Sequence, residues 1–275
     1  IRLLLITFFL QFFPELIKGI QTKMREHGYS IVQLNNEWDP EIEQENFNYM
    51  MQTRVDGAII SPAHQATNFG VLGNTPFILI TNSKHFSKYD TIGNDSRRGM
   101  IMALERLFEL GHRRIALLAG GSMRGGSSWR FDTIKEFYSK KNMSFPEGLN
   151  IHCDMNESSL ASFSKARSSV RNFLESGKSV TAIFASNDIL AIAALHVANE
   201  KGIKIPKELS IVGMDGILLS EITYPSLTTV EKNRSKIGSL AAESLIQKIN
   251  NPFKWQTKKV ILPCKLIERN STGPI

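Results

Sequence analysis

Short apolar segments alternate with amphipathic segments along the whole chain, and this rhythm constrains the fold more than any other feature. Leu3–Thr7 is an apolar run typical of a buried strand, and Phe13–His27 carries apolar residues at helical spacing before Gly28, a typical helix stop. Strands that alternate in this way with helices predict parallel sheets covered by helices on both faces. We therefore expect a chain of the α/β class.

The alternation runs in two successive series. In the first, the expected strands are Leu3–Thr7, Ser30–Leu34, Gly57–Ser61 and Phe77–Thr81, and a helix follows from about Asp95 to Leu110. The second begins with a strand at Arg114–Ala119, closed by Gly120–Gly121, and continues through strands Ala182–Ala185 and Ser210–Met214. The two series predict two doubly wound subdomains, whose sheets would form a ligand cleft from their strand ends.

Composition and charge narrow the class further. The 275 residues are 42% hydrophobic and 21% charged, which is typical of a globular chain and excludes a disordered or fibrous one. The net charge of +7 is scattered, with no basic run of the kind that marks a nucleic-acid surface.

The cysteines and the hydropathy of the chain indicate where in the cell the protein is located. The two cysteines, Cys153 and Cys264, are far apart and predict free thiols in a reducing, cytoplasmic setting. The apolar residues 1–13 are shorter than the ~20 residues that a membrane span needs. They also lack the basic start and cleavage site of a signal peptide, so we expect no membrane association.

Signatures of catalysis or of cofactor binding do not occur in the sequence. No GxGxxG opens a helix after a strand, none of the six histidines has zinc-ligand spacing, and a GxSxG nucleophile elbow is missing. The sequence therefore predicts a binding protein with no cofactor and no metal, rather than an enzyme.

Polar and aromatic residues gather instead at the expected strand ends, where open α/β sheets bind their ligands. Such a set suits a sugar, since charged and amide groups bond hydroxyls while an aromatic face covers the ring. Each residue also has a structural alternative: helix capping for Asn187 and Asp215, and core packing for one of the two phenylalanines. A purely structural role explains Arg130 least well, because a cation at the start of a helix is unfavourable against the helix dipole. The candidate ligand residues are Phe12, Phe13, Asn82, Arg130, Asn187 and Asp215.

Several ordered motifs resemble the ligand-binding core of the LacI/GalR family of bacterial transcription regulators. Residues 12–19 (FFPELIKG) resemble its FFxELIxG segment, and residues 109–120 (ELGHRRIALLAG) its ELGHRRIAxLxG signature. Residues 185–191 (ASNDILA) match AxNDxxA, residues 225–230 (PSLTTV) resemble PPLTTV, and residues 266–273 (LIERNSTG) resemble LVxRxSTG. The resemblance covers nearly the whole chain.

The resemblance implies a periplasmic-binding-protein-like fold with three crossings between the subdomains. On that basis we expect one subdomain at residues 1–119 plus 231–254 and the other at 120–230 plus 255–275. It also implies a homodimer whose small-molecule effector, sugar-like in character, changes its affinity for operator DNA. By position, Arg130, Asn187, Asp215 and a phenylalanine match the family's effector-binding residues.

The sequence departs from the family pattern at positions near the expected effector site. The family's GFDD reads Gly-Met-Asp-Gly here, which places Gly216 where a second aspartate is usual, and Thr81-Asn82 replaces a common Asp-Arg pair. The family reads DNA with a helix-turn-helix headpiece, which does not occur in this sequence. We therefore expect this chain by itself to hold little affinity for operator DNA, which would be bound only through such a headpiece. Two other interpretations remain: a periplasmic sugar-binding protein of a transport system on the same fold, and an enzyme of the doubly wound class.

Overall fold

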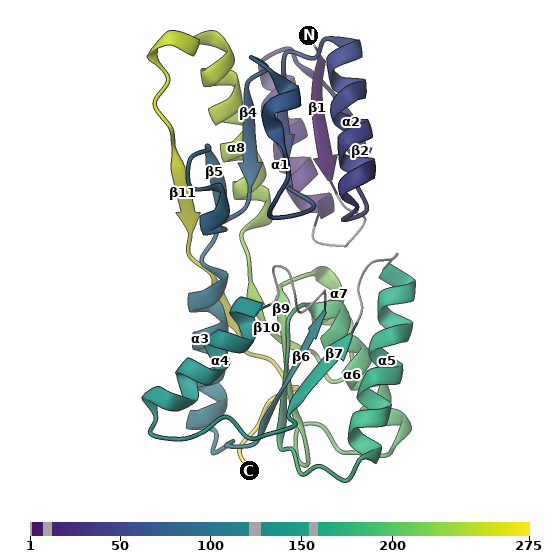
Figure 1. Cartoon of the computed structure of the whole chain (residues 1–275). Helices are drawn as coiled ribbons and strands as arrows, with labels where there is room; N and C mark the ends of the chain where they lie inside the picture. The colour runs from purple at the N-terminus through teal and green to yellow at the C-terminus, as the bar shows by residue number, and fades with distance from the viewer. Residues whose placement is uncertain (1, 8–12, 121–127, 154–158) are drawn as a thin grey trace. The chain divides into compact units, whose positions relative to one another are not determined.

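A computed structural model describes residues 2–7, 13–120, 128–153 and 159–275, and these form two α/β units. Unit 1 comprises residues 1–95 and 233–262, and unit 2 comprises residues 96–232 and 263–275. Each unit has its own six-stranded sheet (Figure 1). The α/β class and the two subdomains predicted from the alternation are confirmed.

The sheet of unit 1 has the strand order β11-β5-β4-β3-β1-β2, and every neighbouring pair is parallel. Its elements are β1 (Arg2–Thr7), α1 (Phe13–Glu26), β2 (Ser30–Asn35), α2 (Pro40–Thr53), β3 (Gly57–Ile60), the 3-10 turns η1 (Phe69–Leu72) and η2 (Lys84–Phe86), β4 (Phe77–Ile80), β5 (Thr91–Asn94), α8 (Arg234–Asn250), η3 (Pro252–Lys254) and β11 (Lys259–Leu262).

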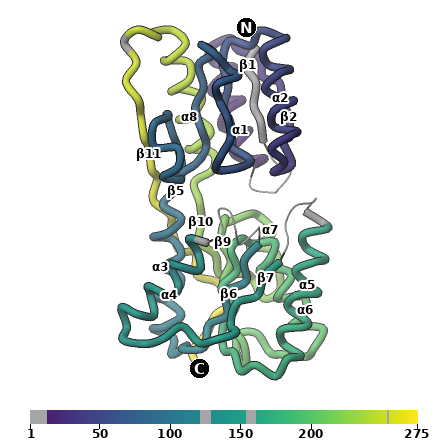
Figure 2. The backbone as a smooth tube through the Cα atoms, in the orientation of Figure 1, coloured from purple at the N-terminus to yellow at the C-terminus, as the bar shows by residue number. Residues whose placement is uncertain are grey.

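The two faces of this sheet carry separate cores, as a doubly wound sheet requires. Ile59 packs with residues of α1 and α8 on one face, whereas its neighbours Ala58 and Ile60 pack with Phe47 and Met50 of α2 on the other. Helices α1 and α8 lie side by side (Figure 2). A Cβ on Gly238 would lie 2.1 Å from the Leu16 carbonyl oxygen, so glycine is required for this close approach.

The sheet of unit 2 has the order β12-β10-β9-β8-β6-β7. Its elements are α3 (Ser96–Glu109), β6 (Ile115–Gly120), α4 (Ser128–Lys140), β7 (Asn150–Cys153), α5 (Ser159–Glu175), β8 (Ala182–Ala185), α6 (Asp188–Glu200), β9 (Ser210–Asp215), α7 (Leu218–Ile222), β10 (Thr228–Glu231) and β12 (Lys265–Ile267). The edge strand β12 runs antiparallel to β10, an exception to the parallel sheets expected from the sequence.

Two strands were not expected from the hydrophobic pattern, because each is short and carries polar residues. β7 alternates in burial along its four residues at the edge of its sheet. β10 buries Thr228 and Thr229 completely, and their hydroxyls form hydrogen bonds with Thr272 and Asp188. The hydrogen bonds that make burial of these hydroxyls possible come from residues far away in the sequence, which a local hydrophobic pattern does not contain.

The crossings between the units differ from the expected boundaries. The first lies after Asp95, not after Ala119, because α3 packs its Met100, Leu104 and Leu107 in one cluster with Ile115 of β6. The second lies after Lys232, and the third lies after Leu262 rather than residue 254, because β11 pairs with β5.

Candidate functional site

The sheet order places a topological switch point in each unit. In unit 1, β1 has β2 on one side and β3 on the other, and in unit 2, β6 lies between β7 and β8. Ligands of open α/β sheets bind outside the carboxyl ends of strands at such points. Of the predicted ligand residues, Asn82 follows β4, Asn187 follows β8 and Asp215 ends β9, as the strand-end argument requires.

The aromatic candidates of unit 1 lie at the start of α1. Phe13 is 5% exposed and belongs to the core cluster of α1 and α8. It therefore packs in the core, the structural alternative that we gave for one of the two phenylalanines. Phe12 lies outside the described residues.

Asn82 is an exposed residue beyond β4. Its side-chain amide donates a hydrogen bond to the backbone oxygen of Asn94, the last residue of β5. The Asn94 side chain is 5% exposed and donates to the Leu262 carbonyl at 3.3 Å, whereas its Oδ1 has no hydrogen-bond partner among the described residues. Buried acceptors such as this oxygen normally have a hydrogen-bond partner. Asn94 was not among the ligand residues predicted from the sequence.

Arg130 lies in the first turn of α4, as expected, and its side chain is half-buried. Its guanidinium lies over the Trp129 ring, with 4.6 Å between the guanidinium carbon and the ring centroid. Burial lowers the pKa of Arg130 to about 10, and the attraction of Asp215 opposes this shift. Arg130 and Asp215 are therefore close enough to interact electrostatically.

Asn187 is the N-cap of α6, the structural alternative considered for it. Its Oδ1 accepts a hydrogen bond from the Leu190 backbone N–H at 2.9 Å. This contact satisfies one of the donors that a helix start leaves free, and it fixes the orientation of the side chain at the carboxyl end of β8.

Asp215 ends β9 in a backbone conformation that is rare for a residue with a side chain. Its φ is 126°, and Gly216 follows with φ 71°. The Asp215 Oδ1 accepts a hydrogen bond from Lys232 Nζ at 2.7 Å. Lys232 was not singled out by the sequence argument, because the sequence separates it from Asp215 by a helix and a strand.

A second aspartate lies beneath this position. Asp188, the first residue of α6, is fully buried, and burial together with the charge of Asp215 raises its pKa to about 6. Its carboxylate accepts hydrogen bonds from the Ile217 N–H and the Thr229 hydroxyl. Arg130, Asp188, Asp215 and Lys232 thus form an electrostatically coupled group in unit 2, which we call the carboxyl-edge cluster.

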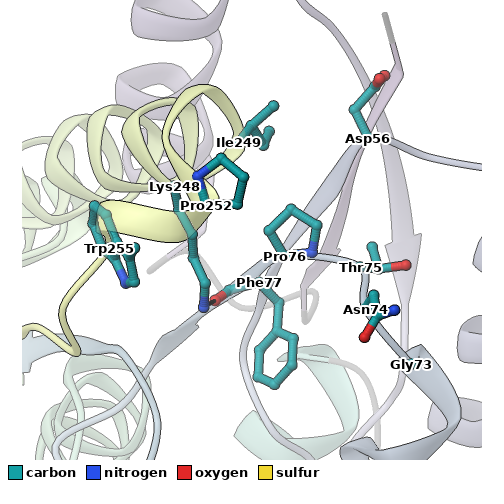
Figure 3. Close-up of a pocket in the computed structure, with 10 residues that line it drawn as sticks. All are labelled: Asp56, Gly73, Asn74, Thr75, Pro76, Phe77, Lys248, Ile249, Pro252 and Trp255. Carbon is teal, nitrogen blue, oxygen red and sulfur yellow. Dashed lines mark hydrogen bonds between the residues drawn. The ribbon is translucent and has the colours of Figure 1, made fainter.

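A separate pocket lies in unit 1, away from the strand carboxyl ends (Figure 3). It has a volume of about 520 Å³ and contains none of the predicted ligand residues. Asp56 directly precedes β3 and Pro76 directly precedes β4, so the pocket lies at the amino ends of these strands. Lys248 reaches from α8 to donate to the Phe77 carbonyl at 3.1 Å and to Asp90 at 2.6 Å, so this lysine is held in structural contacts.

Neither a metal-ligand cluster nor a membrane-spanning helix is found among the described residues. Within the described ranges, no three His, Cys, Asp or Glu side chains gather closely enough to hold a metal ion. Among the helices of those same ranges, none combines the length and the apolar character needed to cross a membrane.

The fold and its strand-end residues define a class of ligand-binding protein. The model of the periplasmic binding protein-like domain matches residues 104–272, and the chain belongs to this family. Its named relatives are transcriptional regulators, which confirms the resemblance to the LacI/GalR family drawn from the motifs.

Three curated relatives illustrate the similarity. The HTH-type transcriptional regulator DegA of Bacillus subtilis is 29% identical, over 96% of this chain and 78% of the relative. The ribose operon repressor of Escherichia coli K12 is 26% identical, over 94% and 78%. The transcriptional repressor PurR of Aliivibrio fischeri MJ11 is 28% identical, over 87% and 71%.

Solved structures share the fold. The complex of the transcriptional regulator CelR with cellobiose superposes with a TM-score of 0.85 at 21% identity, covering 98% of this chain and 84% of the other. A LacI family regulator from Enterococcus faecium with bound ribose gives 0.82 at 24% identity and covers both chains fully. At these identities the likeness establishes the architecture alone.

Proposed function

We propose that this chain is the effector-binding and dimerisation domain of a bacterial transcriptional repressor that senses a sugar or a sugar derivative. The carboxyl-edge cluster carries the proposal, because it presents a carboxylate and two cationic side chains where this fold binds small molecules. The curated relatives that regulate transcription, among them a ribose operon repressor, support it. A regulator of this kind would act in the cytoplasm and is not an enzyme.

Asp215, Arg130 and Asn187 are the proposed ligand residues of unit 2. A half-buried carboxylate accepts hydrogen bonds from sugar hydroxyls, and a guanidinium donates to hydroxyl or carboxylate oxygens. Asn82 and Phe12 are the proposed ligand residues of unit 1, where Asn94 Oδ1 adds a buried acceptor. Effector contacts that differ between conformational states would shift the population of those states.

Dimerisation is part of the proposal, and an apolar surface on unit 2 supports it. Leu218 and Ile222 on α7 are 68% and 67% exposed, and the nearby Tyr224 is 94% exposed. Neighbouring exposed apolar residues of this size commonly mark a protein interface. Operator DNA would be bound through a helix-turn-helix headpiece, and the dimer would set the spacing of the two half-sites.

A thermal-shift screen tests the ligand proposal. Sugars, sugar phosphates, sugar acids and nucleobases would be added to the chain and to its Arg130→Ala and Asp215→Ala variants. A ligand at 100 times its dissociation constant adds about 2.7 kcal/mol of stability, which shifts the melting temperature measurably. We expect a sugar-class hit that both variants lose.

Arg97→Ala is the matched control, because Arg97 pairs with Glu136 on the surface and both side chains are about half exposed. A hit that persists in the Arg130 and Asp215 variants would refute the site. The alternative, a sugar-binding protein for transport, shares the fold, and a monomer in light scattering that still binds a sugar would favour it.

A further inference from the structure

The Asp188 carboxylate bonds to strand β10 and to the segment that follows β9. Its Oδ2 accepts a hydrogen bond from the Ile217 backbone N–H at 2.8 Å, and its Oδ1 accepts one from the Thr229 hydroxyl at 2.5 Å. The Gly216 N–H also contributes to holding its charge. One buried side chain thereby joins α6 to the end of β9 and to β10.

The space around Asp188 fits a carboxylate in this position. A Cβ on Gly213 would lie 2.2 Å from the Asp188 Oδ1, so glycine at this point of β9 makes room for the acid. The capping role at this helix start already belongs to Asn187. A helix cap therefore does not explain the orientation of Asp188, and burial of an ionisable group is costly without specific partners.

The backbone that Asp188 holds is the segment that presents Asp215. The φ of 126° at Asp215 is a conformation that residues with a side chain rarely adopt, and it persists only where surrounding contacts enforce it. The Ile217 N–H, two residues further on, is bound by Asp188, and the Gly216 N–H donates to the Thr229 hydroxyl at 3.3 Å. Thr229 in turn donates to Asp188, which closes the network.

We infer that Asp188 is the positioning residue of the effector site, which fixes residues 215–217 through Ile217 and Thr229 and so aims the Asp215 carboxylate at the ligand. This inference rests on the proposed function, because it takes Asp215 as a ligand residue. Asp188 is fully buried, so it acts through Asp215 rather than by touching the effector.

The inference predicts a pH-dependent affinity. The charged groups at the neighbouring strand and helix ends are Asp215 on β9, Glu231 and Lys232 at the end of β10, Glu221 on α7 and Arg130 on α4. Burial and the charge of Asp215 raise the pKa of Asp188 to about 6. Protonation below that pH removes acceptor capacity from the network, so ligand affinity should fall there.

The experiment compares four variants with the parent chain, using D-ribose as the probe in calorimetry between pH 5 and pH 8. Asp188→Asn preserves the shape of the side chain but loses an acceptor. Thr229→Val removes the hydroxyl, Thr229→Ser restores it, and Asp215→Ala removes the ligand group itself. Crystal structures of the Asp188→Asn and Thr229→Val variants report the backbone at residue 215 without any ligand.

We expect Asp188→Asn and Thr229→Val to weaken ribose binding at least tenfold, Thr229→Ser to recover it, and the pH dependence near 6 to vanish in Asp188→Asn. Unchanged affinity in Asp188→Asn, with binding lost in Asp215→Ala, would overturn the inference and leave the proposed function standing. If Asp188→Asn fails to fold, the Thr229 pair decides the question.

A parent chain that shows no ribose binding, or an Asp215→Ala variant that binds normally, counts against ribose or against the proposed site. The crystal structures then decide the inference. A relaxed backbone at residues 215–217 would support the positioning role, and a preserved positive φ at Asp215 in both variants would refute it.

Discussion

Lys232 donates a hydrogen bond from Nζ to the Asp215 Oδ1 at 2.7 Å, and each side chain is only 14% exposed. The pair joins the end of β9 to the residue that follows β10, which is also the last residue before the chain returns to unit 1. The carboxylate proposed to meet the effector therefore already accepts a hydrogen bond from a cationic side chain of the protein.

Replacing Lys232 by glutamine should destabilise the chain. The change removes the ammonium group that donates to a largely buried carboxylate, and hydrogen bonds to charged groups contribute about 1.5–3 kcal/mol. We expect a loss of that size in the free energy of unfolding, measured by urea denaturation at pH 7.5. The exposed pair of Arg97 with Glu136 supplies the control, and Arg97→Gln should change stability by less than about 0.5 kcal/mol. Equal effects of the two substitutions would contradict the prediction that the Lys232–Asp215 pair stabilises the folded chain.

Asp188 should make the folded state bind a proton near pH 6. Its folded-state pKa of about 6 lies above its ordinary value of 3.8, so between these values the folded chain holds a proton that the unfolded chain has released. Its contribution to stability therefore rises as the pH falls through 6, by up to about 3 kcal/mol at acidic pH.

The difference in unfolding free energy between the parent chain and Asp188→Asn isolates this contribution. That difference should shift in favour of the parent chain between pH 7.5 and pH 4.5. Asp132→Asn, on the exposed side of α4, is the control. A difference independent of pH would show that Asp188 titrates normally.

His112 should contribute to stability with the opposite pH dependence. It is 2% exposed, with Nδ1 3.1 Å from the Thr181 hydroxyl and Nε2 3.0 Å from the Gly273 carbonyl oxygen. It thereby connects the C-terminal segment to the residues that precede β6 and β8. Burial lowers the pKa of His112. The unfolded chain consequently binds the proton more readily, and stability present above the ordinary pKa of 6.5 is lost as the pH falls below it.

The substitution His112→Gln tests this contribution. It should cost about 1–3 kcal/mol at pH 8, because buried partners lose their hydrogen bonds, and the cost should shrink at pH 5. His85→Gln, at an exposed position of η2, should have little effect at either pH. A cost for His112→Gln that grows toward pH 5 would reverse the sign and refute the argument.

Gly238→Ala should disrupt the contact between α1 and α8. The new methyl group would meet the Leu16 carbonyl oxygen at 2.1 Å, a backbone atom that cannot rotate away. Forcing the helices apart should cost at least about 2 kcal/mol, since overpacking typically costs 1–3 kcal/mol. Lys236→Ala, two residues earlier on the same helix and exposed, should stay within about 0.5 kcal/mol. Thermal unfolding of the two variants gives the comparison.

The sequence predicted correctly those elements that depend on neighbouring residues, and it missed those that depend on contacts between residues far apart in the chain. The strand Ala182–Ala185 was predicted with the bounds it has, because its apolar run is a local property of the chain. The short strand β10 was missed, since its buried threonines make sense only beside Asp188 and Thr272. The first crossing was placed too late for the same reason, as α3 finds its core on β6, which follows it in the sequence.

The candidate residues show the same division. Asp215, Asn187 and Arg130 could be named from strand ends, helix starts and family motifs, and each lies on the expected element. Lys232, Asp188 and Asn94 could not be assigned their contacts, because those contacts are set by partners that lie far away in the sequence. Phe13 could be a ligand residue or a core residue by its motif, and its packing among α1 and α8 decided in favour of the core.

The sequence by itself therefore determined the α/β class, the alternation of elements, the family and the residues at the strand ends, because periodicity and motifs are properties of neighbouring residues. Only the tertiary structure decided where the chain crosses between the units, which glycines permit close packing, and how a buried aspartate holds the backbone of Asp215. These depend on strand order and on burial, which bring together residues from different parts of the chain and change the free energies of their charges.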